Sequence, residues 1–86
     1  MANMAQQRKR VRQDVQKRRQ HRMFKQSLKT AMKNVENNVE KGDKSQAEIA
    51  LNRAHKKLDK ALSKGIHKKN YVARNKSRLQ KRVNTL

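Results

Sequence analysis

Helix-breaking residues are nearly absent from this 86-residue chain, and this limits its fold more than any other feature of the sequence. Proline does not occur, and glycine occurs only at Gly42 and Gly65. Because these two residue types most strongly disfavour helix interiors, the glycines divide the chain into three long stretches without a breaker. We therefore expect an all-α protein of three helices.

The residues around both glycines have the chemistry of tight turns between helices. Gly42 can adopt the left-handed conformation that ends a helix, and Asp43 followed by Gln46 can form a capping box that begins the next one. Gly65 suits the same terminating position, and Ile66 can pack back onto the preceding turn. Both connections are short enough to join antiparallel helices.

Apolar side chains recur at steps of three and four residues in each stretch, which is the spacing of one helical face. The three stripes are Phe24, Leu28, Ala31, Met32, Val35 and Val39; Ala47, Ala50, Leu51, Ala54, Leu58, Ala61 and Leu62; and Val72, Leu79, Val83 and Leu86. They predict a three-helix up-down-up bundle.

The first helix is expected over residues 5–41, about 55 Å long, yet its stripe begins only at Phe24. We therefore expect one domain over 1–86, with 24–86 as the bundle and 1–23 as a long protruding basic arm. With no helix to pack against, the arm can be disordered in the free protein.

Positive charge is concentrated at the two ends of the chain. The chain has 25 Lys and Arg against 6 Asp and Glu, a formal net charge of +19. Residues 1–33 hold eleven basic and one acidic side chain, residues 34–63 six and five, and residues 64–86 eight and none. Such self-repulsion opposes folding unless a partner neutralises it. The distribution predicts a nearly neutral packing segment flanked by two surfaces that bind a polyanion.

The projecting arm is positive on all sides. One helical face carries Arg8, Arg12, Arg19 and Arg22, and the others carry Lys9, Arg10, Lys17, Arg18 and Lys25. Charge on all sides suits insertion between several phosphate backbones, as in a folded RNA. A planar guanidinium group can also form two hydrogen bonds to one phosphate. The third helix adds Arg74, Arg78, Lys81 and Arg82 opposite its apolar stripe.

Several other classes of protein fit the sequence poorly. Cysteine is absent, which excludes disulfides, thiolate metal sites and a cysteine nucleophile. No apolar run is long enough for a signal peptide or a membrane span, so we expect a cytoplasmic protein without a membrane partner. No glycine-rich phosphate loop or catalytic constellation appears, so we expect no enzyme, cofactor or small-molecule substrate.

The few aromatic and imidazole side chains leave one question open. His21, His55 and His67 lie far apart in sequence and lack cysteine companions, so no metal site is expected. Tyr71 can either stack on a nucleic-acid base or cap the core of the bundle. The sequence favours neither role.

Four segments together resemble the bacterial small-subunit ribosomal protein family S-twenty: residues 8–13 (RKRVRQ), 27–33 (SLKTAMK), 42–44 (GDK) and 73–79 (ARNKSRL). The resemblance covers essentially the whole chain. It departs from the family at Ala5, Gln6 and Gln7, where lysine and small residues are usual, and at His67, which is displaced by one position.

The resemblance implies a three-helix bundle with a protruding first helix that binds small-subunit ribosomal RNA directly and supports subunit assembly beside other small-subunit ribosomal proteins. The implied RNA contacts are Arg8, Lys9, Arg10, Arg12, Lys17, Arg18, Arg19, Arg22, Lys25 and Lys29 in the first helix, and Arg74, Lys76, Arg78 and Arg82 in the third.

Three other functions remain open from composition. A DNA-compacting nucleoid protein would use the same charge, because phosphate neutralisation does not distinguish sugars. A membrane-surface peptide fits less well, because the arm lacks a broad apolar face. A mitochondrial presequence is normally rich in serine, unlike this N-terminus.

Overall fold

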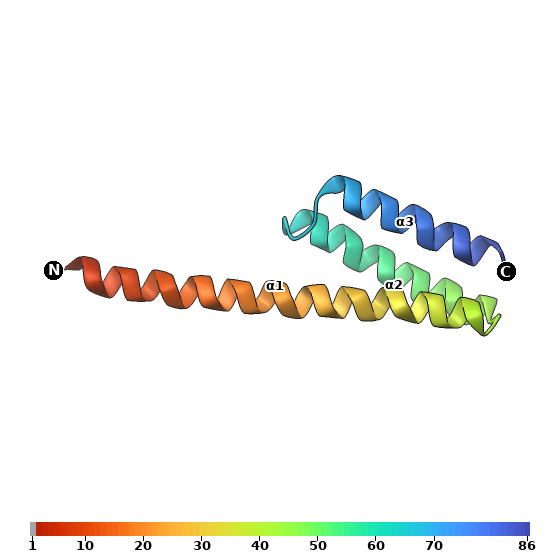
Figure 1. Cartoon of the computed structure of the whole chain (residues 1–86), viewed down its shortest axis with the longest axis horizontal. Helices are drawn as coiled ribbons and strands as arrows, with labels where there is room; N and C mark the ends of the chain where they lie inside the picture. Colours follow the sequence, from red (N-terminus) through yellow and green to blue (C-terminus); the bar gives the residue numbers. More distant parts are fainter. Residues whose placement is uncertain (1) are drawn as a thin grey trace.

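A computed structural model of the chain describes residues 2–86, with side chains described from Arg8 onward. Three helices follow one another: α1 (Ala2–Glu40), α2 (Lys44–Ser63) and α3 (Lys69–Asn84). Helix α2 runs back along the C-terminal half of α1, and α3 runs parallel to α1 (Figure 1). The described residues contain no strand. The prediction of an all-α, up-down-up bundle is confirmed.

Helix α1 is much longer than its partners. Its 39 residues span about 58 Å, whereas the 20 residues of α2 span about 30 Å. Every described side chain from Arg8 to Met23 is exposed, and packing onto the other helices begins at the half-buried Phe24. The N-terminal half of α1 therefore projects beyond the bundle (Figure 1).

The core is thin and built largely from small side chains. Its buried members are Leu28, Ala31, Met32 and Val35 of α1; Ala47, Ala50, Leu51, Ala54, Leu58 and Ala61 of α2; and Val72, Leu79 and Val83 of α3. Alanines facing a neighbouring helix allow the backbones to approach closely. Among the described residues no charged or polar side chain is buried.

The stripe predicted for α2 is wrong at its last member. Leu62 is 40% exposed, because Ala61, one residue earlier, occupies the buried position in the last turn of the helix. Ile66, beyond the helix, packs against the core instead.

The first turn ends α1 and begins α2 within three residues. Gly42 has φ +71°, and its N–H donates to the Val39 carbonyl (3.0 Å), while the Asp43 N–H donates to the Asn38 carbonyl (3.1 Å). The Asp43 carboxylate accepts from the backbone N–H of Gln46 (3.1 Å). The predicted capping box is only half formed, because the Asp43 N–H is already bonded to Asn38.

The second turn has the predicted Schellman geometry. Gly65 has φ +70°, its N–H donates to the Leu62 carbonyl (3.1 Å), and the Ile66 N–H donates to the Ala61 carbonyl (2.9 Å). The chain then passes close to α1 before α3 begins.

Candidate nucleic-acid interface

Exposed basic side chains follow α1 from the arm into the bundle, with one interruption at residues 13–16, which include Asp14. All ten cations predicted for α1 are exposed. A shallow depression along one side of this helix is lined by Arg18, His21, Arg22, Lys25, Lys29 and Lys33, with Gln26 and Thr30 beside them. Steps of three and four residues keep these cations on one side of the helix.

The basic side chains of α3 divide into two groups. Arg78 donates to Glu36 of α1 (Nη1 to Oε1, 2.7 Å), and Lys76 donates to Asp59 of α2 (Nζ to Oδ1, 2.9 Å). Both ion pairs are partly exposed, so each stabilises the bundle by about 1 kcal/mol or less. These pairs reduce the charge that Lys76 and Arg78 can offer to a ligand. Arg74 and Arg82 are exposed.

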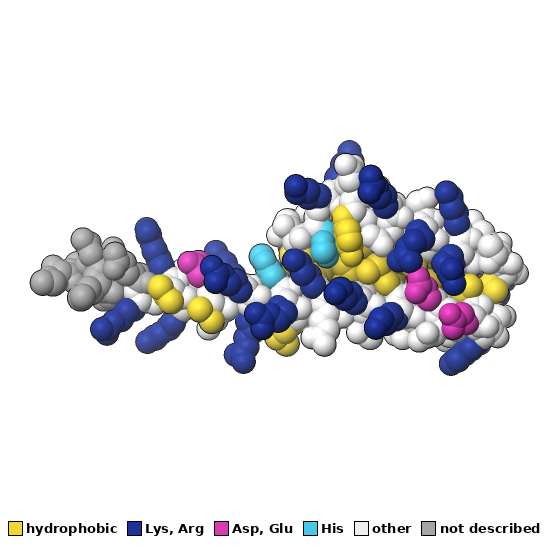
Figure 2. Space-filling model, viewed as in Figure 1, with side chains coloured by type: hydrophobic (Ala, Val, Ile, Leu, Met, Phe, Trp, Pro, Cys, Tyr) yellow, Lys and Arg dark blue, Asp and Glu magenta, His cyan; other side chains and the backbone are white. Residues whose placement is uncertain are grey.

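The fold brings the two basic ends of the sequence to one face of the molecule. The Arg78–Glu36 pair joins α3 directly to α1. Figure 2 shows Lys and Arg side chains along both helices, with apolar side chains between the two rows. A single anionic surface can therefore contact α1 and α3 together.

The loop between α2 and α3 lies against α1 where the arm leaves the bundle. The Lys64 ammonium is 4.8 Å from the centre of the Phe24 ring. The rings of His67 and Tyr71 stack, with centroids 4.0 Å apart and planes 20° from parallel. Partial burial, and to a lesser degree the charge of nearby Lys25, lower the pKa of His67 below its usual value. This imidazole is therefore neutral at neutral pH.

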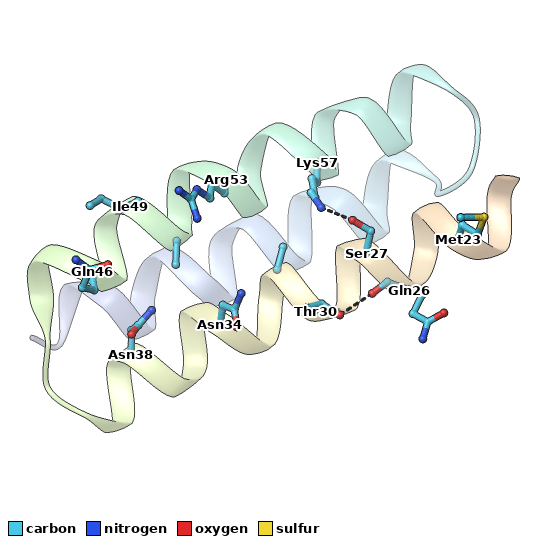
Figure 3. A pocket seen from close by; sticks show the side chains of 12 residues that line it. Met23, Gln26, Ser27, Thr30, Asn34, Asn38, Gln46, Ile49, Arg53 and Lys57 are labelled. Carbon is cyan, nitrogen blue, oxygen red and sulfur yellow. Dashed lines mark hydrogen bonds between the residues drawn. The ribbon is translucent and has the colours of Figure 1, made fainter.

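A different surface lies between α1 and α2. A groove of about 470 Å³ is lined mainly by hydrogen-bonding side chains without charge, namely Gln26, Ser27, Thr30, Asn34, Asn38 and Gln46. Its cations are Arg53 and Lys57, and Lys57 donates to the Ser27 hydroxyl across the groove (Figure 3). The lining contains no carboxylate or imidazole and is completed by four apolar side chains, Met23, Ala31, Ile49 and Ala50.

Over the part of the chain that the structure describes, no group of three or more His, Cys, Asp or Glu side chains could hold a metal ion. His21, His55 and His67 lie on α1, on α2 and in the second loop.

No helix in the described range is both long and apolar enough to cross a membrane.

The family model described as Ribosomal protein S20 matches residues 2–84 of this chain. The chain belongs to the ribosomal protein S20 family. It is 48% identical over 86 residues to the small ribosomal subunit protein bS20 of Aster yellows witches'-broom phytoplasma, covering all of both chains. It is 50% identical to the bS20 protein of Acholeplasma laidlawii and 44% identical to that of Beutenbergia cavernae, again over all of both chains. The resemblance drawn from four short segments is confirmed.

Some residues of this S20-family chain were missed as candidates for the interface. Lys33 extends the row that contains Lys25 and Lys29, and its four-residue step from Lys29 was a signal that could have found it. Stacking of His67 on Tyr71 was not foreseen, because the four-residue spacing crosses the start of α3 and predicts no contact by itself.

Proposed function

We propose that this chain is a structural component of the small ribosomal subunit that binds directly to small-subunit ribosomal RNA and supports assembly of the subunit. Membership of the ribosomal protein S20 family supports the subunit role. The observation that carries direct RNA binding is the series of exposed cations along α1, from the projecting arm into the bundle.

The proposed contacts are the fourteen cations predicted from the sequence: Arg8, Lys9, Arg10, Arg12, Lys17, Arg18, Arg19, Arg22, Lys25, Lys29, Arg74, Lys76, Arg78 and Arg82. Each phosphate that they neutralise releases condensed counterions, so binding weakens steeply with salt. Lys76 and Arg78 contribute less than Arg74 and Arg82, because each already faces a carboxylate.

Arm and bundle have different tasks in this proposal. The bundle holds α1 and α3 on one face, which fixes the register of the protein on the RNA. The arm carries cations on all sides and one described acid, Asp14, so it gains most where phosphates surround it. Crevices between packed RNA helices provide such a site, and bridging their backbones would favour the compact RNA during assembly. The protein acts in the cytoplasm, next to other small-subunit proteins, and performs no catalysis.

Sedimentation and competition test this function together. Protein from gently lysed cells should sediment with small ribosomal subunits and remain there at moderate salt. Purified protein should bind deproteinised small-subunit RNA in the presence of excess duplex DNA. If duplex DNA of equal phosphate concentration displaces the RNA completely, the protein is a DNA-compacting protein and the proposal is wrong.

A further inference from the structure

Tyr71 lies at the surface of the bundle. The residue is 37% exposed, and it is absent from both the buried core and the half-buried apolar side chains that pack against the core, which are Phe24, Val39, Ile66 and Leu86. The sequence left two roles open for this ring, and its exposed part is available for the role of stacking on a base.

His67 holds the Tyr71 ring in place. The two rings lie nearly parallel, 4.0 Å apart, so the imidazole covers one face of the phenol ring. The exposed part of Tyr71 must therefore come from its other face and its edges. The backbone also orients the ring, because Tyr71 lies in the first turn of α3, where its carbonyl accepts from the Asn75 side chain (2.8 Å).

Cations lie close to this ring pair. Lys25 is near enough to His67 to affect its ionisation, and Lys64 reaches over Phe24 from the same loop. Figure 2 shows apolar side chains between the two basic rows, with Lys and Arg on either side. A partly exposed flat ring that stacks on an imidazole, with basic side chains nearby, has the features of a site for a nucleotide whose base is unpaired.

We propose that the His67–Tyr71 pair is a platform on which one unpaired purine of the bound RNA stacks. The proposal rests on the proposed function and adds to it a ligand class and two residues. The base would lie on the free face of Tyr71, giving a three-layer stack of base, phenol and imidazole, while Lys25 or Lys64 binds the phosphate next to it. Paired bases cannot use this platform, because their faces are covered by neighbours within the duplex.

The sequence provides a spectroscopic probe for this contact. Tyr71 is the only tyrosine and there is no tryptophan, so tyrosine fluorescence reports on this ring alone. The probes are an RNA hairpin with one bulged adenosine and the same hairpin without the bulge, which have nearly equal charge. Binding of the bulged hairpin should quench the fluorescence, whereas the fully paired hairpin should bind more weakly and leave it nearly unchanged.

Three variants separate stacking from charge and from stability. Tyr71→Leu should lower affinity for the bulged hairpin by about 5- to 150-fold, the range for loss of one stacked base, and leave affinity for the paired hairpin unchanged. Tyr71→Phe keeps the ring and should keep the preference for the bulge. Ile49→Ala removes another exposed apolar side chain, 45% exposed and lining the α1–α2 groove, and should change neither affinity. Melting followed by circular dichroism should be alike in all four proteins.

The failure of this proposal can be distinguished from the failure of RNA binding. If both hairpins bind equally, without quenching and without an effect of Tyr71→Leu, the platform does not exist although RNA binding stands. If neither hairpin nor deproteinised small-subunit RNA binds, the proposed function itself is wrong.

Discussion

At the scale of single residues, burial within one helix turn decides which leucine of α2 matters for stability. Leu58 is fully buried, and Leu62, one turn later, is 40% exposed. Periodicity alone placed both on the same stripe. The difference arises because Ala61 occupies the buried position in the last turn of α2, and Ile66 of the following loop packs against the core.

Leu58→Ala should therefore destabilise the bundle by about 2–5 kcal/mol, since it removes a fully buried side chain and leaves a cavity. Leu62→Ala in the same helix is the matched control, and it should cost less than about 1 kcal/mol. Urea unfolding followed by helical circular dichroism measures both values. Equal losses of unfolding free energy in the two variants would show that Leu62 packs as tightly as Leu58, which contradicts this prediction.

The burial of single residues could be predicted from the sequence, but their contacts across helices could not. Apolar periodicity identified every buried residue of the core, because it depends on only one helix at a time. Contacts between side chains on different helices could not be predicted in this way. The pairing of Arg78 with Glu36 and of Lys76 with Asp59 depends on how the helices are placed against each other, and periodicity does not contain that information.

At the scale of elements, α1 consists of two halves with different support. From Phe24 onward it packs on α2 and α3, whereas every described side chain of the arm is exposed. Helices without tertiary packing are marginally stable in water. Like charges four residues apart weaken this one further, as between Arg8 and Arg12 and between Arg18 and Arg22. Its helical conformation is therefore the least stable part of the fold.

Hydrogen exchange of the free protein should show amides of residues 8–20 exchanging at nearly unprotected rates, and those of residues 28–62 strongly protected. Binding to small-subunit RNA should slow exchange in the arm, because phosphates neutralise its repulsion and fix the helix. Exchange measured by mass spectrometry, with and without RNA, tests both statements. Equal protection of both regions in the free protein would mean that the arm has an intramolecular partner.

At the scale of the whole molecule, chain order and charge distribution act together. The two basic segments are the ends of the sequence, and an up-down-up bundle makes the first and third helices parallel neighbours (Figure 1). Their cations therefore border one face, while two acids from the middle segment, Glu36 and Asp59, pair with Arg78 and Lys76 of α3. Sequence alone predicted two basic surfaces, and the topology joins them into one.

Position of the charge, rather than its total, should consequently determine affinity. Changing Arg8, Arg12, Arg19 and Arg22 to Gln should weaken binding to small-subunit RNA strongly while the bundle melts normally, because all four side chains lie on the exposed arm. If each neutralises about one phosphate, the slope of log K against log salt should become shallower by roughly 3–4 units.

The matched control changes Lys41, Lys44, Lys56 and Lys60 to Gln, which removes the same charge from exposed sites outside the proposed interface. Lys57 is left intact in this control, because its bond to Ser27 joins α1 to α2. The control should lose much less affinity and change the slope much less. Equal losses of affinity in the arm variant and the control variant would mean that net charge alone governs binding. In that case the position of the cations, on the arm or on the side of the bundle, would have no effect on the affinity for RNA.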